Sequence, residues 1–354
     1  MAMSLDEFLE EWNNPSPYVH VQTSGSTGTP KPMLVEKQRM LNSARITCDF
    51  LGLREGDTAL LCMSLDYIAG KMMVVRSIER GLKLITVEPS GHPLYHDGVC
   101  SFASNDAKEQ IPNNNPLPSM GRGKGWGVNF AAMVPMQVYN TLQVAEECER
   151  LKQIRHLIIG GGAIDDALAS ALKTFPNHVW STYGMTETLS HIALRRLNGP
   201  EASEWYTPFP SVKVSLNEDS CLVIDAPLVC PSRLVTNDIA ELSSGTVPNM
   251  KFRILGRKDN VICSGGIKIQ IETLECQLRP HLQAPFLITK RPDAKFGEAV
   301  VLLTEGAVDE ARRVCAQVLP KYNQPKAYLH VDKIPLTATG KPARKEAENI
   351  AKSR

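Results

Sequence analysis

The segment TSGSTGTPK, residues 23–31, is a loop rich in hydroxyl groups and glycine that ends in Pro-Lys, directly after the strand-like segment YVHVQ. Successive backbone N–H groups in such a loop form a concavity that binds anions, and Lys31 adds a positive charge to the hydroxyl donors. Phosphate is the natural ligand of this combination. The spacing is not that of a Walker A loop. The segment therefore predicts a phosphate-binding loop of another class, with a Ser/Gly loop that binds nothing as the alternative.

The residues that surround this loop alternate between strand-like and helix-like segments. Apolar runs are followed by amphipathic stretches, two of which stop at Gly52 and Gly81. This alternation predicts an α/β fold with parallel strands. We expect strands within 18–22, 57–65, 82–89, 127–135, 154–162 and 178–187, and helices at 4–12, 40–52, 69–81, 136–153 and 164–175.

The pattern changes at about residue 205, where short strand-like segments with turn signals predict an antiparallel sheet. A second break falls at GRKDN, residues 256–260, and a mixed strand and helix pattern follows it. We therefore expect an N-terminal domain at 1–256, with an α/β core at 18–204 and an antiparallel part at 205–256. A small α+β domain is expected at 257–354.

Polar or glycine-rich loops follow three of the expected strands, at 23–31, 160–162 and 182–187. Ligands of open α/β sheets bind at the carboxyl ends of strands. The position of the three loops predicts one shared site.

Four further motifs follow the first loop: YGMTE (183–187), TND (236–238), GRKDNVICSGGIKI (256–269) and PLTATGKPAR (335–344). Each alone is compatible with a simple turn. Together with residues 23–31, and over essentially the whole chain, they resemble the motifs of the adenylate-forming enzymes. These enzymes include acyl-CoA and aryl-CoA ligases, luciferases and peptide-synthetase adenylation domains. The resemblance implies that the C-terminal domain is mobile.

The resemblance also implies a site for ATP. The first loop would hold the β- and γ-phosphates, and Tyr183 would lie beside the adenine, opposite the GGGA segment at 160–163. Asp238 would bind the ribose hydroxyls, with Arg257 nearby. The residues implied to bind ATP or coenzyme A are Thr23, Ser24, Gly25, Ser26, Thr27, Gly28, Lys31, Gly161, Gly162, Ala163, Tyr183, Gly184, Asp238, Arg257, Ser264, Gly265 and Gly266.

Three residues are implied to act on the reacting groups. Thr186 would contact the α-phosphate, and Glu187 would help to hold Mg²⁺, which favours carboxylate and phosphate oxygens. Lys341 would bridge the carboxylate of the substrate and the phosphate. A cation at that place lowers the barrier because the carboxylate must approach an anionic phosphorus centre.

The implied reaction has two steps. A carboxylate attacks the α-phosphate of ATP and gives an acyl-adenylate and pyrophosphate, and a thiol then displaces AMP. In the family the small domain rotates between the steps about a hinge residue, which corresponds to Asp259. The loop at 264–268 would then replace Lys341 at the site.

Two segments resemble the o-succinylbenzoate–CoA ligases of menaquinone biosynthesis: LCMSLDYIAGKMMVVRSIERG (61–81) and STYGMTETLSHIALRR (181–196). That substrate has two carboxylates and an aromatic ring. We expect Tyr67, His191 and Arg195 in its pocket, and Arg196 is a further candidate. Many relatives have a histidine where Tyr67 stands, so the pocket wall is expected to differ.

The composition excludes other classes of function. With 39 basic and 38 acidic side chains, the chain has no excess charge that points to a nucleic-acid partner. Nine cysteines without C-x-x-C pairs predict reduced thiols in a cytoplasmic protein. No apolar run reaches the length of a membrane span. Family members usually carry a longer region before the phosphate loop. We therefore expect either a naturally compact member of the family, or a second copy or partner subunit that covers the exposed face.

Three functions remain open at this point. The first is an o-succinylbenzoate–CoA ligase that uses ATP, Mg²⁺ and coenzyme A. The second is another aryl- or acyl-CoA ligase, or an adenylating enzyme that loads a carrier protein. The third is a nucleotide-binding module without activity, against which the presence of Glu187, Asp238 and Lys341 argues.

Overall fold

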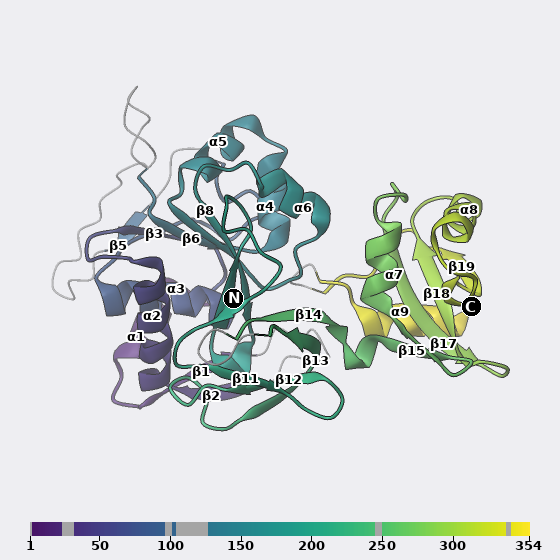
Figure 1. The fold of residues 1–354 in the computed structure, drawn as a ribbon. Helices are drawn as coiled ribbons and strands as arrows, with labels where there is room; N and C mark the ends of the chain where they lie inside the picture. The colour runs from purple at the N-terminus through teal and green to yellow at the C-terminus, as the bar shows by residue number, and fades with distance from the viewer. Residues whose placement is uncertain (1, 23–31, 96–100, 104–126, 245–249, 338–340) are drawn as a thin grey trace.

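The computed structural model describes residues 2–22, 32–95, 101–103, 127–244, 250–337 and 341–354. The phosphate loop predicted at 23–31 and Cys100 lie outside these residues. Figure 1 shows a larger part that contains three sheets and a smaller C-terminal part that contains the fourth. We use "C-terminal part" for residues 257–354.

The main sheet has the parallel core that the sequence predicts. Five strands run parallel, in the order β8-β7-β6-β3-β4, and antiparallel strands extend both edges to give β10-β9-β8-β7-β6-β3-β4-β5. The strands are β3 (Thr58–Leu61), β4 (Lys83–Thr86), β5 (Ser101–Ala103), β6 (Phe130–Met133), β7 (His156–Ile159), β8 (His178–Gly184), β9 (His191–Arg196) and β10 (Thr207–Pro208).

Helices cover both faces of this sheet, because successive strand residues point to opposite sides. In β6, Phe130 packs with the core that includes α2 and α3, whereas Ala131 packs with the core under α4 to α6. The helices are α2 (Lys37–Leu51), α3 (Ile68–Arg80), α4 (Pro135–Leu142), α5 (Ala145–Gln153) and α6 (Asp166–Leu172).

The helix ends follow local signals, with one exception. Gly52 and Gly81 end α2 and α3 with φ of 63° and 66°, the left-handed conformation that glycine adopts most readily. The single helix predicted at 136–153 is wrong, because α4 and α5 are separate. The backbone N–H of Gln143 and Val144 donates three residues back, which tightens and ends α4.

Three smaller structures complete the larger part. Helix α1 (Leu5–Asn13) starts at Ser4, which forms a capping box with Glu7. Strands β1 (Tyr18–Gln22) and β2 (Pro32–Glu36) form an antiparallel pair outside the main sheet. The expectation that residues 23–31 follow a strand of the main sheet is therefore wrong. The predicted antiparallel sheet consists of β11 (Lys213–Leu216), β12 (Cys221–Asp225), β13 (Leu234–Leu242) and β14 (Phe252–Arg257).

The C-terminal part has a mixed sheet with its own apolar cores. Its domain boundary stays a prediction. The strands are β15 (Val261–Ser264), β16 (Ile267–Gln270), β17 (Phe286–Asp293), β18 (Gly297–Thr304) and β19 (Ala327–His330), and the helices are α7 (Ile271–Leu278), α8 (Val308–Val318) and α9 (Arg344–Ser353). Among the described residues, no helix is both long and apolar enough to span a bilayer.

Candidate functional site

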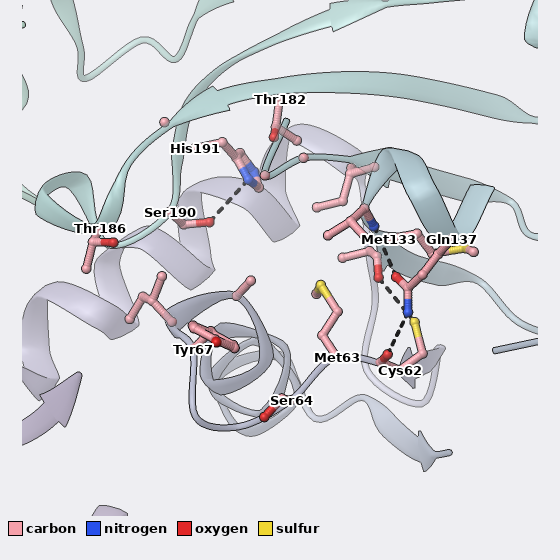
Figure 2. Close-up of a pocket in the computed structure, with 18 of the residues that line it drawn as sticks. Cys62, Met63, Ser64, Tyr67, Met133, Gln137, Thr182, Thr186, Ser190 and His191 are labelled. Carbon is pink, nitrogen blue, oxygen red and sulfur yellow. Dashed lines mark hydrogen bonds between the residues drawn. The ribbon is translucent and has the colours of Figure 1, made fainter. Parts of the chain in front are cut away.

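A cavity of about 490 Å³ lies at the carboxyl ends of β6, β7 and β8, facing the start of α3. Figure 2 shows Met63, Tyr67 and Met133 on its walls, together with Thr186 and His191 from the region after β8. Most of these side chains are apolar, as in pockets that bind an organic ligand. Two of the three loops predicted to share a site, those after β7 and β8, therefore do so.

The turn after β8 carries Thr186 and Glu187 in a short 3-10 helix, Thr186–Thr188. A Cβ at Gly184 would lie 2.2 Å from the carbonyl oxygen of Ser190, so only glycine allows this close return of the chain. Thr186 is nearly buried and lines the cavity, whereas Glu187 is exposed. The turn therefore holds a hydroxyl at the cavity and a carboxylate that water or a ligand can reach.

Tyr183, Asp238, Arg257 and Asp259 form one hydrogen-bonded cluster. The Tyr183 hydroxyl donates to Asp238 Oδ2 at 2.6 Å, and Arg257 Nη1 donates to Asp238 Oδ1 at 3.0 Å. Arg257 Nη2 also donates to Asp259 Oδ2 at 3.1 Å. Burial opposes the charge of Arg257, but Asp238 and Asp259 together raise its pKa. Burial and the Asp238 charge raise the pKa of Tyr183, which keeps its hydroxyl protonated.

Lys341, from the C-terminal part, lines the same cavity. Its backbone N–H donates to Thr337 Oγ1 at 3.1 Å, and its carbonyl oxygen accepts from Thr337 N at 2.7 Å. Burial and the nearby Arg257 charge lower the pKa of the Lys341 ammonium. A partly desolvated cation at this place interacts strongly with an anionic group in the cavity.

The glycine turn after β7 borders the cavity on another side. Gly161 lines the cavity and has a φ of 80°, whereas Gly162 and Ala163 are exposed beside it. Gly160 packs against Thr182, whose hydroxyl oxygen would lie 2.4 Å from a Cβ at position 160. The two strand ends therefore pack closely at Gly160, and the residues that follow it lie exposed next to the cavity.

Ser264, Gly265 and Gly266 lie outside the residues that line the cavity. Ser264 ends β15, and Gly265 and Gly266 form the turn to β16, with φ of 57° and 82°. Their expected contact with coenzyme A stays a prediction, as does the hinge role of Asp259.

The residues predicted to contact the acid divide into two groups. Tyr67 and His191 line the cavity. Arg195 does not, and its guanidinium lies over the ring of Tyr206, 5.2 Å from the centroid. Arg196 lies over Trp180 at 5.0 Å and is also outside the cavity. Arg195 lies outside the cavity because it pairs with Ser181, farther back along β8, whereas His191 pairs with Gly184 at the strand end that borders the cavity.

Arg76, on α3, is a charged cavity residue that the sequence reasoning missed. It is only 2% exposed, yet it lines the cavity. Its Nη2 donates to Ser190 Oγ at 2.6 Å, and its Nε has no hydrogen-bond partner. No carboxylate of the described residues pairs with it. Burial lowers the pKa of Arg76 to about 10. The signal in the sequence was a lone arginine within MMVVRS, a run of buried helix positions.

A buried arginine without a counter-ion is costly, and proteins usually pair such a charge. In a cavity, the missing partner indicates an anionic group on a ligand. The site therefore offers a buried guanidinium, an ammonium from the C-terminal part, and an apolar wall between the strands and α3.

Comparison with known proteins gives the family. A scan against models of known families finds no match. A 2-succinylbenzoate–CoA ligase of Lactococcus lactis is 23% identical over 93% of this chain and 70% of its own. A solved Bacillus subtilis o-succinylbenzoate coenzyme A synthetase, in complex with ATP and magnesium ion, is 21% identical, with a TM-score of 0.69 over 92% of this chain and 69% of its own.

The crystal structure of an acyl-CoA synthetase (AMP-forming)/AMP-acid ligase II-like protein from Dyadobacter fermentans is more similar in sequence and in length. It is 31% identical, covers 98% of this chain and 92% of its own, and has a TM-score of 0.59. On this identity and coverage, the chain belongs to the family of AMP-forming acyl-CoA synthetases, which are acid–thiol ligases.

Proposed function

We propose that the chain converts o-succinylbenzoate to o-succinylbenzoyl-CoA through an acyl-adenylate. Arg76 carries this proposal, because its buried, unpaired guanidinium lines the cavity and suits a substrate with a second carboxylate. The apolar walls around Met63 and Met133 suit an aromatic ring. The relatives whose names include this substrate support the same choice.

In the first half-reaction, one carboxylate of the acid attacks the α-phosphate of ATP, and pyrophosphate leaves. Lys341 would contact both the carboxylate and the phosphate, and its ammonium would stabilise the negative charge that builds up between them. Thr186 would donate a hydrogen bond to the α-phosphate. The loop at 23–31 would hold the departing phosphates.

The described residues fit a nucleotide with Mg²⁺. Asp238 and Arg257 form a rigid polar pair that suits the ribose hydroxyls, and Tyr183 and Gly161 would border the adenine. No group of three or more metal-ligating side chains occurs in the described part of the chain. Glu187 would thus be the main protein ligand, which fits Mg²⁺ held by one carboxylate and by phosphates. The ion would neutralise phosphate charge.

In the second half-reaction, the thiol of coenzyme A would attack the acyl carbon, and AMP would leave with the bonding electrons. We propose that the C-terminal part takes a different position in each half-reaction and that Asp259 is the hinge between the two positions. Coenzyme A would bind near Ser264, Gly265 and Gly266. Division of the chain near residue 256 would let the C-terminal part withdraw Lys341. Self-association and a cytoplasmic location stay predictions.

The first experiment is ATP–pyrophosphate exchange with o-succinylbenzoate, benzoate or a medium-chain fatty acid, with and without Mg²⁺. We expect Mg²⁺-dependent exchange with o-succinylbenzoate alone. Exchange with benzoate or the fatty acid would redirect the proposal to another acyl-CoA ligase. Absence of exchange with every acid would favour a binding module.

A second experiment tests the role of Lys341. Lys341→Ala should abolish exchange but largely spare thioester formation from supplied acyl-adenylate and coenzyme A. Equal loss of both half-reactions would contradict this role. Coenzyme A and a carrier-protein thiol are to be compared as acceptors in the same assay.

A further inference from the structure

A chain of hydrogen bonds runs from Arg76 into the core behind the cavity. Arg76 Nη2 donates to Ser190 Oγ at 2.6 Å, and Ser190 Oγ lies 3.2 Å from His191 Nδ1. His191 Nε2 lies 3.0 Å from Thr47 Oγ1, and Thr47 Oγ1 donates to the carbonyl oxygen of Ser43 at 3.0 Å. Figure 2 shows the link between Ser190 and His191.

The direction of each hydrogen bond follows from the last acceptor in the series, the Ser43 carbonyl oxygen. The Ser43 carbonyl can only accept, so the Thr47 hydroxyl donates to it and accepts from His191 Nε2–H. His191 is buried next to the Arg76 charge, and both effects hold its pKa well below the ordinary value, so the ring is neutral. Its Nδ1 then accepts from the Ser190 hydroxyl. The Ser190 oxygen is left to accept from Arg76.

This chain is what orients the Arg76 guanidinium. Among the described residues, Ser190 Oγ is its only oxygen acceptor within hydrogen-bond distance. Its other contacts are the Met73 sulfur, 3.8 Å from Nη1, and the Phe130 ring, 6.0 Å from the guanidinium carbon. Sulfur is a weak acceptor, and a ring face imposes little direction.

The backbone holds Ser190 and His191 in place. Leu189, directly before them, has a φ of 64°, which is unusual for a side chain of this size, and it is only 3% exposed. Strain of this kind persists where the surroundings fix the conformation, and it is common at binding sites. Thr47, by contrast, belongs to α2, is fully buried and does not line the cavity.

We propose that Thr47 is a positioning residue: through His191 and Ser190 it fixes the Arg76 guanidinium, and it thereby sets the preference for acids with a second carboxylate. This inference rests on the proposed function, since it concerns the same cavity. Thr47 touches neither the acid nor ATP. Its loss should therefore weaken the contribution of the second carboxylate and leave the reacting groups in place.

The test compares o-succinylbenzoate with 4-oxo-4-phenylbutanoate, which has the same skeleton without the ring carboxylate. The measured quantity is the ratio of kcat/KM for the two acids in ATP–pyrophosphate exchange. Thr47→Val should lower this ratio about tenfold, which equals about 1.4 kcal/mol. The change should appear in KM for o-succinylbenzoate, with KM for ATP unchanged. Thr47→Ser keeps the hydroxyl and should restore the ratio.

Thr141→Val is the matched control, because Thr141 is also a fully buried threonine but lies on α4, outside the cavity. It should leave the ratio unchanged. Ser190→Ala removes the hydroxyl that links Arg76 to His191. It should lower the ratio even where Thr47→Val fails to fold.

Two outcomes would overturn the inference. One is an unchanged ratio in Thr47→Val or Ser190→Ala, and the other is an equal loss with both acids, which indicates a packing role. Arg76→Met separates this failure from a failure of the proposed function. If Arg76→Met collapses the ratio and Thr47→Val does not, only the positioning role is wrong. If Arg76→Met also leaves the ratio unchanged, the second carboxylate is bound elsewhere, and Arg76 no longer supports the proposed function, whose own test is exchange with o-succinylbenzoate.

Discussion

Replacing Arg76 by methionine is expected to make the ligand-free protein more stable and the ligand-bound protein less stable than wild type. Methionine has a similar length and carries no charge, so it removes a buried cation without leaving a large void. Buried charged groups are often replaced by apolar residues with a gain in stability. The acid, however, loses the cation that we propose for its second carboxylate.

The size of the first effect follows from the pKa. The pKa of Arg76 falls from 12.5 to about 10, and one pKa unit corresponds to about 1.4 kcal/mol. The folded state thus disfavours the charged side chain by about 3 kcal/mol. For a base with a lowered pKa, this penalty is fully present below the folded pKa of about 10 and disappears as the pH rises from there to the ordinary pKa of 12.5. Arg76→Met also loses the hydrogen bond to Ser190, which offsets about 2 kcal/mol of this gain in stability.

A net gain of about 1 kcal/mol remains, which corresponds to a rise in Tm of about 1 °C for a chain of 354 residues, because the entropy of unfolding is about 2.1 cal/mol/K per residue. Binding of the acid reverses the order of stability of wild type and Arg76→Met. At 100 times its Kd, o-succinylbenzoate would stabilise the wild type by about 2.7 kcal/mol. A variant that binds about 100-fold more weakly would gain about 0.4 kcal/mol under the same conditions.

The assay is thermal unfolding of both proteins at neutral pH, with and without o-succinylbenzoate. Arg80→Met is the matched control on the same helix. Arg80 is paired with Asp49 and binds the Leu53 carbonyl oxygen, outside the cavity. We expect no gain in Tm from Arg80→Met and an undiminished effect of the acid. A lower Tm of ligand-free Arg76→Met, together with equal protection by the acid, would refute the reasoning.

Three other predictions concern the nucleotide, the catalytic lysine and the C-terminal core. Burial lowers the pKa of Lys341 from its ordinary value of 10.5, so the ammonium should lose its proton, and the exchange rate should decline, at a pH below 10.5. Lys341→Arg should move this decline to higher pH in a pH–rate profile. Asp238→Ala should raise KM for ATP by about tenfold or more, since it also leaves Arg257 without its buried partner; an unchanged KM in the exchange assay would contradict the ribose contact. Arg344→Ala should cost about 3 kcal/mol in urea unfolding, because Glu275 would remain as an unpaired, nearly buried charge.

The local parts of the fold could be predicted from the sequence. Helix ends at Gly52 and Gly81 depend on residues within one turn, and so does the capping box that starts α1. The division between α4 and α5 escaped prediction because residues 136–153 keep a helical pattern across the break. Strand β9 was also missed, since its pairing with β8 depends on the sharp turn at Leu189.

The candidate site was predictable where a motif carries it, and not where tertiary contacts make it. Tyr183, Asp238 and Lys341 were selected from motifs. Lys341 lines the cavity, whereas Tyr183 and Asp238 bond to each other outside the residues that line it, and their shared role stays a prediction. Arg76 and Ser190 are 114 positions apart, so nothing local indicates their contact. The place of Arg195 was not predictable for the same reason, because its distance from the cavity follows from its pairing with Ser181 in β8.

The positions of Arg76 and Lys341 suggest how one cavity handles an acid with two like charges. Arg76 is fixed in a helix of the larger part, surrounded by buried side chains. Lys341 reaches the same cavity from the C-terminal part. If the C-terminal part withdraws between the half-reactions, only the cation at the reacting carboxylate leaves. The acyl group would then stay anchored at its other end by Arg76, while the acyl carbon becomes accessible to the thiol. On this proposal, the costly charge of Arg76 belongs to the larger part, where its loss would release the intermediate, and the charge of Lys341 belongs to the part that we expect to move.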